Sequence, residues 1–227
     1  MKVKILIASL IVTCFMVNVS YAGVGLGIDF KGGLNLAKLR GDDVKDLEDM
    51  GLDIKMRPGA VAGLGLGVVI ADMFVIQPEF LFAMKGIKSE MEESGMSLTS
   101  TFRLNYLEIP LLLKFNIPAG DVLIPNVYVG PALAINLSAK VTNEADPEEL
   151  LQLSGLDDEI DMKDDTKAVD FGLAMGGGLD IKAGPGRVII DIRYTLGFLI
   201  IDDTETEADM KNGALSFIVG YGIDIGG

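Results

Sequence analysis

The stretch Tyr106–Phe115, with the sequence YLEIPLLLKF, decides the fold class of this chain. Successive side chains of a strand point to opposite faces, so one face of this stretch is entirely apolar and the other carries tyrosine, glutamate and lysine. The apolar face comprises Leu107, Ile109, Leu111, Leu113 and Phe115. The same alternation recurs about eight times in the chain, and no segment of helical periodicity remains to cover the apolar faces. A closed barrel with lipid outside and a polar interior accommodates every copy.

Segments of alternating character predict eight strands joined by connections of alternating length. The predicted strands are residues 25–36, 57–70, 74–86, 102–115, 126–140, 168–182, 187–200 and 215–225. The long connections are residues 37–56, 87–101, 141–167 and 202–212, with a short helix expected at residues 42–50. Long external loops, short periplasmic turns and an even strand number are typical of outer-membrane barrels.

Composition and charge agree with this pattern. The mean hydropathy is +0.40 although the formal net charge is −14, and the long connections hold 24 of the 33 acidic residues but fewer than half of the 19 basic ones. We therefore predict that residues 23–227 form one all-β domain, an eight-stranded antiparallel up-and-down transmembrane β-barrel with long acidic external loops and both termini in the periplasm. A soluble barrel or sandwich is the alternative. The acidic balance argues against nucleic acid as a partner, because binding it needs a basic surface.

The N-terminus is typical of a cleavable export signal. Lys2 and Lys4 precede an apolar segment at residues 5–17, and residues 20–22 (SYA) resemble an A-x-A cleavage site. This segment is shorter than the ~20 residues of a spanning helix. We expect residues 1–22 to be removed, so that the mature protein begins at Gly23.

The mature chain is expected to carry little reactive chemistry. The only cysteine, Cys14, lies in the export signal, and a lipoprotein acylated on Cys14 is the alternative to simple cleavage. The sequence has no histidine, the usual base of enzymes built on outer-membrane barrels. We therefore expect no enzyme, no catalytic residue, no cofactor and no metal ligand. The acidic segment Asp157–Asp165 is interpreted as a solvated loop, with weak calcium or magnesium binding near lipopolysaccharide head groups as the alternative.

The charges predicted to face the barrel interior form the candidate site, as a structural network. They are Asp29, Lys31, Glu79, Lys85, Glu108, Lys114, Asp191 and Arg193. Unpaired charges are costly in so narrow a space, so we expect Glu79 and Glu108, on neighbouring strands, to share cations such as Lys114, Lys31 or Arg193. A gated ion or proton path is the alternative, but side chains can just fill an eight-stranded interior.

Glycines and aromatic residues have expected places in this barrel. Inward glycines leave room for long charged side chains, or else for a small ligand cavity. The repeat Gly63-x-Gly65-x-Gly67 falls on strict alternation with no helix after it, which argues against a nucleotide-binding loop. Five aromatic residues are expected to anchor the barrel at the two membrane interfaces: Phe74, Phe102, Phe115, Tyr194 and Tyr221.

Several stretches carry a family resemblance. They are Gly27–Leu36 (GIDFKGGLNL), Gln77–Phe80 with Lys85-Gly86, Leu104–Lys114 (LNYLEIPLLLK), Val129-Gly130-Pro131 and Ile192–Gly197 (IRYTLG). Together they resemble the PorT-like outer-membrane β-barrel domain of Bacteroidetes-type Gram-negative bacteria, over nearly the whole mature chain. The resemblance implies an eight-stranded outer-membrane barrel and no assigned activity for most members. The chain ends without the usual terminal aromatic residue, so Tyr221 and Ile223 are expected to take part in recognition by the barrel assembly machinery.

These observations predict an integral outer-membrane protein of structural or recognition type. Its acidic external loops would contact a protein partner or an outer-membrane assembly, and its wall would contact lipid and lipopolysaccharide. A small passive, porin-like channel for ions or small solutes is the alternative. A filled interior favours the first and a continuous water path favours the second.

Overall fold

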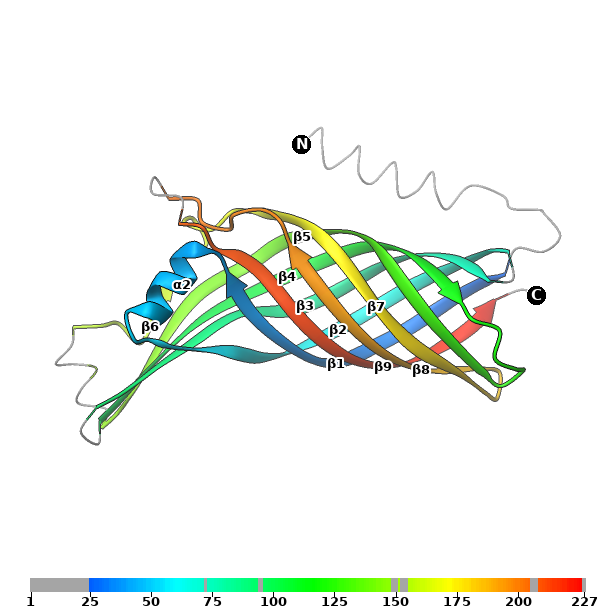
Figure 1. Cartoon of the computed structure of the whole chain (residues 1–227), viewed down its shortest axis with the longest axis horizontal. Coiled ribbons are helices and arrows are strands. Elements are labelled where there is room, and N and C mark those ends of the chain that lie inside the picture. Colours follow the sequence, from blue (N-terminus) through cyan, green and yellow to red (C-terminus); the bar gives the residue numbers. More distant parts are fainter. Residues whose placement is uncertain are drawn as a thin grey trace.

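A computed structural model of the chain describes residues 25–71, 73–93, 96–147, 151, 155–204 and 208–225, and antiparallel strands dominate it (Figure 1). The export signal predicted for residues 1–22 lies outside the described residues. The elements are β1 (Leu26–Arg40), α2 (Asp42–Asp49), β2 (Asp53–Ala71), β3 (Phe74–Glu93), β4 (Met96–Asn116), β5 (Leu123–Asp146), β6 (Glu159–Asp161), β7 (Val169–Ala183), β8 (Gly186–Gly197) and β9 (Lys211–Ile225).

Eight of these strands close into a ring. Neighbours along the chain pair antiparallel, and β1 pairs with β9 from Leu26 opposite Ile225 to Arg40 opposite Lys211. The three-residue strand β6 stays outside the ring and pairs only with residues 140–142 of β5, beyond the part of β5 that pairs with β7. The predicted fold class, an eight-stranded antiparallel up-and-down barrel, is confirmed.

The two faces of the barrel wall differ as the alternation requires. Outward apolar side chains such as Phe30 and Val219 are 52% and 63% exposed, whereas the inward charged side chains of Asp29 and Glu79 are fully buried. A water-soluble barrel would place these two classes the other way round, because burying apolar surface is the main driving force of folding in water. An apolar outside and a polar inside suit a wall surrounded by lipid.

The two ends of the barrel are unlike. Both ends of the described chain lie at one end, with the connections that follow β2, β4 and β7, and we call this the turn end (Figure 1). Helix α2 and strand β6 lie at the opposite, loop end. Helix α2 has eight residues, and no helix in the described part of the chain is long and apolar enough to cross a membrane.

The sequence prediction was wrong about residues 87–93 and 96–101, which it assigned to a long loop. Strands β3 and β4 stay paired out to Glu93 and Met96, and β5 pairs with β4 out to Asp146. The three strands therefore extend beyond the ring at the loop end as a projecting sheet (Figure 1). Strands outside the bilayer can pair without an alternation of apolar and polar residues, because no face of them meets lipid. The alternation in the sequence therefore identified only the membrane part of these strands.

Aromatic side chains are distributed differently from the prediction at one position. Phe74 and Phe115 pack against each other at the turn end, with ring centroids 5.2 Å apart. Phe102 instead packs inward, against the cluster of buried apolar residues at the loop end that includes Leu104 and Tyr106. It shares the inward face of β4 with Leu104 and Tyr106, so it does not anchor the wall in lipid.

Candidate functional site

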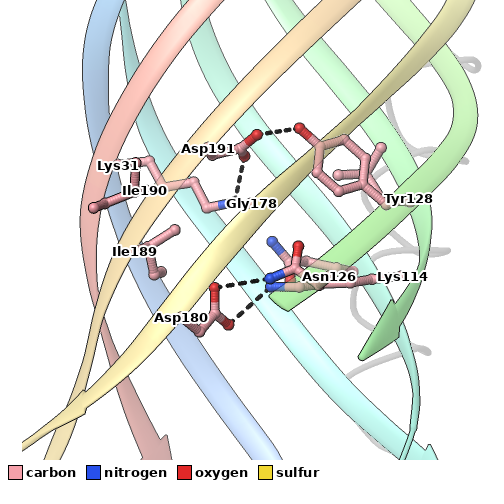
Figure 2. A pocket seen from close by; sticks show the side chains of 11 residues that line it. Lys31, Lys114, Asn126, Tyr128, Gly178, Asp180, Ile189, Ile190 and Asp191 are labelled. Carbon is pink, nitrogen blue, oxygen red and sulfur yellow. Dashed lines mark hydrogen bonds and ion pairs between the residues drawn. The ribbon is translucent and has the colours of Figure 1, made fainter. Parts of the chain in front are cut away.

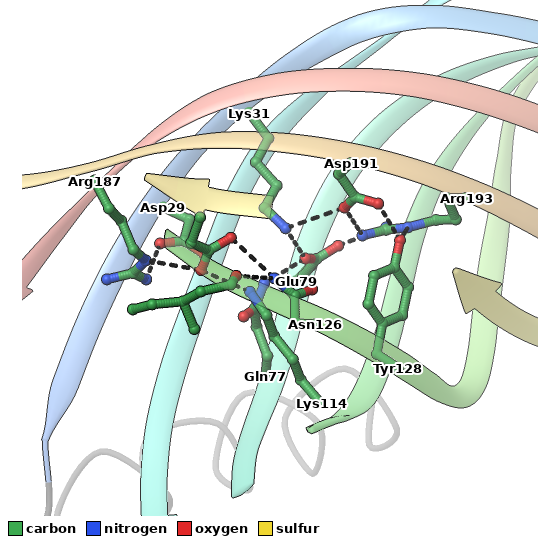
Figure 3. Close-up of polar contacts among 12 residues, drawn as sticks. Asp29, Lys31, Gln77, Glu79, Lys114, Asn126, Tyr128, Arg187, Asp191 and Arg193 are labelled. Atoms are coloured by element: carbon green, nitrogen blue, oxygen red, sulfur yellow. Dashed lines mark hydrogen bonds and ion pairs between the residues drawn. The ribbon is translucent and has the colours of Figure 1, made fainter. Parts of the chain in front are cut away.

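The middle of the barrel holds four charged side chains that we call the central cluster: Lys31, Glu79, Asp191 and Arg193 (Figure 3). Glu79 accepts hydrogen bonds from Lys31 Nζ and from Arg193 Nη1, both at 2.6 Å. Arg193 Nη2 also donates to Asp191 Oδ2 at 3.2 Å, and Lys31 Nζ lies 3.7 Å from the same oxygen. Two cations thus face two carboxylates, and the cluster is neutral.

Polar neighbours complete the central cluster. Gln77 Nε2 donates to Glu79 Oε1 at 2.7 Å. The hydroxyl of Tyr128 donates to Asp191 and accepts from Arg193 Nε at 3.2 Å, while the guanidinium carbon of Arg193 lies 5.2 Å from the centroid of the Tyr128 ring. Arg193 is therefore held by carboxylates, a hydroxyl and an aromatic face while it is only 2% exposed, which is the full pairing that a buried charge requires.

A second set of ion pairs, the turn-end cluster, lies between the central cluster and the turn end of the barrel. Asp180 accepts from Lys114 Nζ at 2.9 Å and from Asn126 Nδ2 at 3.2 Å. Arg187 lies 2.5 Å from Asp29 Oδ1 and 3.3 Å from Asp180 Oδ2, and also pairs with Asp224 at the rim.

The turn-end cluster depends on a glycine. A Cβ atom at Gly222 would lie 2.5 Å from Asp29 Oδ1 and 2.8 Å from Arg187 Cζ. Glycine at this position therefore makes room for a charged pair from the two neighbouring strands, β1 and β8.

A third set of polar contacts, the loop-side cluster, lies between the central cluster and the loop end of the barrel. Lys85 pairs with Glu108 and lies 5.5 Å from the centroid of the Tyr106 ring. Asn212 Nδ2 donates to Asp170 Oδ2 at 2.9 Å and to the hydroxyl of Tyr106 at 3.1 Å. The three clusters together form a column of polar contacts along the barrel.

The structure places all eight predicted site residues in this column, each in an ion pair. The expectation that Glu79 and Glu108 share a cation is wrong. Glu79 binds Lys31 and Arg193, Glu108 binds Lys85, and Lys114 binds Asp180 instead. The two glutamates lie in different clusters because Glu108 stands opposite Leu81 in the β3–β4 register, not opposite Glu79.

Sequence reasoning missed three charged members of the column. Asp170 and Asp180 lie on the inward face of the predicted strand 168–182, and Arg187 is the first residue of the next predicted strand. The alternation of inward and outward residues along these strands could have identified them. Around the central and turn-end clusters, eleven described residues from six strands meet so closely that they leave no cavity (about 0 Å³) (Figure 2). Separate cavities lie beyond them, of about 230 Å³ at the turn end and about 440 Å³ at the loop end.

The carboxylates of the described residues form no metal centre. No group of three or more histidine, cysteine, aspartate or glutamate side chains among them is arranged to hold a metal ion. In the column each carboxylate is instead occupied by a lysine, an arginine or an amide. This arrangement can hold the strands together and fill the lumen, but among the residues that form it there is no free nucleophile or base beside a cavity.

Outside the membrane part, ion pairs and turns shift the pKa values of two carboxyl groups. Hydrogen bonds from Lys55 and Lys88 lower the pKa of Glu90, on the projecting sheet, to about 2. Burial raises the pKa of Asp202, but hydrogen bonds from the Thr204 hydroxyl and from the backbone amides of Ala208 and Thr204 outweigh it and leave that pKa below 3.8. Both groups are therefore anionic at neutral pH.

Comparison with known proteins agrees with this architecture. Residues 22–202 match the family model described as outer membrane protein beta-barrel domain. The chain belongs to this family. Membership places this barrel in the outer membrane. In outer-membrane barrels the long connections are external and the short turns periplasmic, so we expect the loop end to be the external end. No curated protein matches the sequence.

Among solved structures, this outer-membrane barrel is similar to several others. Ail, the attachment invasion locus protein of Yersinia pestis, is 16% identical with a TM-score of 0.43, over 87% of this chain and 98% of Ail. OprG from Pseudomonas aeruginosa is 12% identical with a TM-score of 0.46, over 89% of this chain and 97% of OprG. The outer membrane enzyme PagL is 13% identical with a TM-score of 0.37, over 87% of this chain and 99% of PagL.

Proposed function

We propose that this protein is a non-conducting outer-membrane barrel of structural or recognition type. The observation that carries the proposal is the central cluster, in which Glu79, Asp191 and Arg193 are each at most 3% exposed and no cavity remains around the described side chains that pack there. An eight-stranded barrel has an interior that side chains can just fill. A passive channel would need a continuous water path where these ion pairs lie, so the channel alternative has less support.

We infer that recognition takes place at the external end. The strand-connecting segments there are rich in carboxylates, such as Asp42 and Asp43 at the start of α2, so a protein partner with a basic surface would be drawn to it by long-range electrostatics. Lipid and lipopolysaccharide would surround the wall, and the barrel assembly machinery would insert it.

The finer assignments belong to the same proposal. The absence of histidine from the sequence supports a non-enzymatic protein that uses no cofactor. The residue pattern of Leu104–Lys114 supports a PorT-like member from a Bacteroidetes-type bacterium, and the charged, apolar and small residues of segment 1–22 support export through a cleaved signal peptide.

Single-channel conductance tests the proposal. The refolded mature protein, Gly23–Gly227, is added to a planar bilayer. A difference in gel migration between unheated and heated samples verifies that the barrel is folded. We expect no steady conductance from the folded protein. Steady conductance that changes in a Glu108→Ala variant would show that the interior charges line a path and would refute the proposal.

A variant with a widened middle provides the positive control. Arg193→Ser, Tyr128→Ser and Tyr106→Ser together remove large side chains from the central and loop-side clusters, so folded protein of this variant should conduct. If the wild type is silent while this variant conducts, the assay is sensitive to opening of the lumen, and silence of the wild type reports a filled interior.

A further inference from the structure

The cavity of about 440 Å³ at the external end has a lining quite unlike the polar column below it. Helix α2, the projecting sheet and the segments around Met162 and Met210 line it, and it is partly open to solvent. Eleven of its sixteen lining residues are apolar, including Val44, Ile87 and Phe102. Its volume lies within the ~300–1,000 Å³ typical of small-molecule sites, which are likewise mostly apolar with a few placed polar groups.

The floor of this external cavity separates it from the ion pairs. Leu39 and Ile201, which line the cavity, belong to a cluster of buried apolar residues with Leu104 and Tyr106, the last two fully buried. The hydroxyl of Tyr106 in turn contacts Asn212 of the loop-side cluster. A molecule in the cavity would therefore reach it from outside the cell and would end on an apolar floor.

The charged groups of the lining have one sign. Among the described residues that line the cavity, Asp165 and Asp202 are the only charged ones, and none is a lysine or an arginine. Asp202 is held at the start of a turn by the Thr204 hydroxyl at 2.8 Å and the Ala208 amide at 2.6 Å, so its carboxylate has a fixed position. The charge of Lys167, which lies outside the lining, also acts on Asp202. Asp165 is exposed. Two carboxylates beside a mostly apolar cavity favour a cation over an anion by their electrostatic field.

We propose that the external cavity binds a small amphiphile with an apolar chain and a cationic head, such as an alkylamine. The chain occupies the space between α2 and the projecting sheet, and the ammonium group lies near Asp165 and Asp202. This inference goes beyond the proposed structural or recognition role, because it assigns a small-molecule ligand to a site that a silent barrel would not need.

Methionine methyl NMR on the mature protein in lipid nanodiscs tests this directly. Met162 and Met210 line the cavity, whereas Met175 lies on the outward face of β7 and reports ligand dissolved in the bilayer. On titration with octylamine, we expect saturable shifts of the Met162 and Met210 signals at concentrations that leave Met175 unchanged. Octanoate has the same chain length but the opposite charge. Its dissociation constant should be at least about fivefold higher than that of octylamine, as expected for the loss of one favourable charge interaction.

Two variants separate the parts of the proposal. Asp165→Asn should weaken octylamine binding and leave octanol binding unchanged, because only the amine uses the carboxylate. Ser89→Phe places a large side chain in the cavity lining and should abolish binding of both, in protein whose unheated gel migration verifies folding. Equal binding of octylamine and octanoate would overturn the cationic preference. Shifts of all three methionines together would show partition into the lipid only and would overturn the site.

Discussion

Replacing Glu79 by glutamine tests whether the central cluster is a dry, fully paired structural element. The new side chain would keep one oxygen for Lys31 but would turn an amide NH₂ toward Arg193 Nη1, which now lies 2.6 Å from a carboxylate oxygen. The cluster would change from neutral to a net charge of +1 at a position where Glu79 itself is fully buried. Removing one partner of a buried ion pair costs about 3–5 kcal/mol. We expect the lower half of this range, because Asp191 still faces both cations.

Urea unfolding of the mature protein in lipid vesicles measures this cost, with the folded fraction read from unheated gel migration and from circular dichroism. Glu159→Gln is the matched control, since its pair with Lys140 is exposed at the external end and exposed pairs contribute about 0–1 kcal/mol. A second variant, Glu79→Gln with Lys31→Met, restores neutrality in the cluster. It should unfold at a higher urea concentration than Glu79→Gln alone.

A loss below about 1 kcal/mol for Glu79→Gln would refute this reasoning, because a water-filled interior is the condition under which a missing charge is cheaply replaced by solvent. The absence of any rescue by Lys31→Met would refute it equally, since the cost would then come from shape and not from unbalanced charge.

Three further outcomes follow from other parts of the molecule. Gly222→Ala should destabilise the barrel by about 1 kcal/mol in the same urea assay, the low end of overpacking costs, because the atoms it meets are side-chain ends that can shift. Gly67→Ala should not destabilise it, since an added Cβ there meets no atom closer than 3.5 Å. The depressed pKa of Asp202 means that its turn is stabilised above pH 3.8 and loses that stability as the pH falls through the lower folded-state value. The Ala208 amide signal should therefore be constant from pH 5 to 8 and move only below about pH 3.8, a change absent in Asp202→Asn. Mass spectrometry of protein from the outer membrane should find Gly23 as the first residue, with precursor accumulating in Ala22→Arg.

The faces of the strands could be predicted from sequence because lipid imposes them. Every lipid-facing position must be apolar. In the stretch Tyr106–Phe115 the apolar residues therefore show which side chains of β4 face lipid and which face the interior. The extent of the strands could not be predicted in the same way. Beyond the bilayer no face is constrained, so the paired segments 87–93 and 96–101 resemble a polar loop in sequence.

The inward charges were visible one by one, but their partners were not. Glu79 and Arg193 are 114 positions apart and lie on β3 and β8, which do not pair with each other. Their contact depends on the tilt and stagger with which the ring closes, a property of all eight strands together. The external cavity was hidden for a related reason: Val44, Ile87 and Met210 come from separate segments that only the folded loop end brings together.

The distribution of charge differs between the two parts of this barrel to which we assign a role, the filled interior and the external end that would bind a ligand or partner. In the column, five cations form ion pairs with five carboxylates: Lys31, Lys85, Lys114, Arg187 and Arg193 with Asp29, Glu79, Glu108, Asp180 and Asp191. Asp170, the sixth carboxylate of the column, is bound by the amide of Asn212. The net charge of −14 therefore comes largely from outside the column, where the sequence places most of its acidic residues.

Membrane insertion favours an interior whose charges are paired, because each unpaired charge left in the lumen would raise the cost of folding. An acidic external end is what a cationic ligand or a basic partner would sense from a distance. The apolar floor at Leu104 and Tyr106 lies between the column and the external cavity. The two roles should consequently vary independently: Glu79→Gln should lower the stability of the barrel, yet the octylamine shifts of Met162 should be unchanged in the protein that remains folded. Loss of both properties together would mean that the column also shapes the cavity above it.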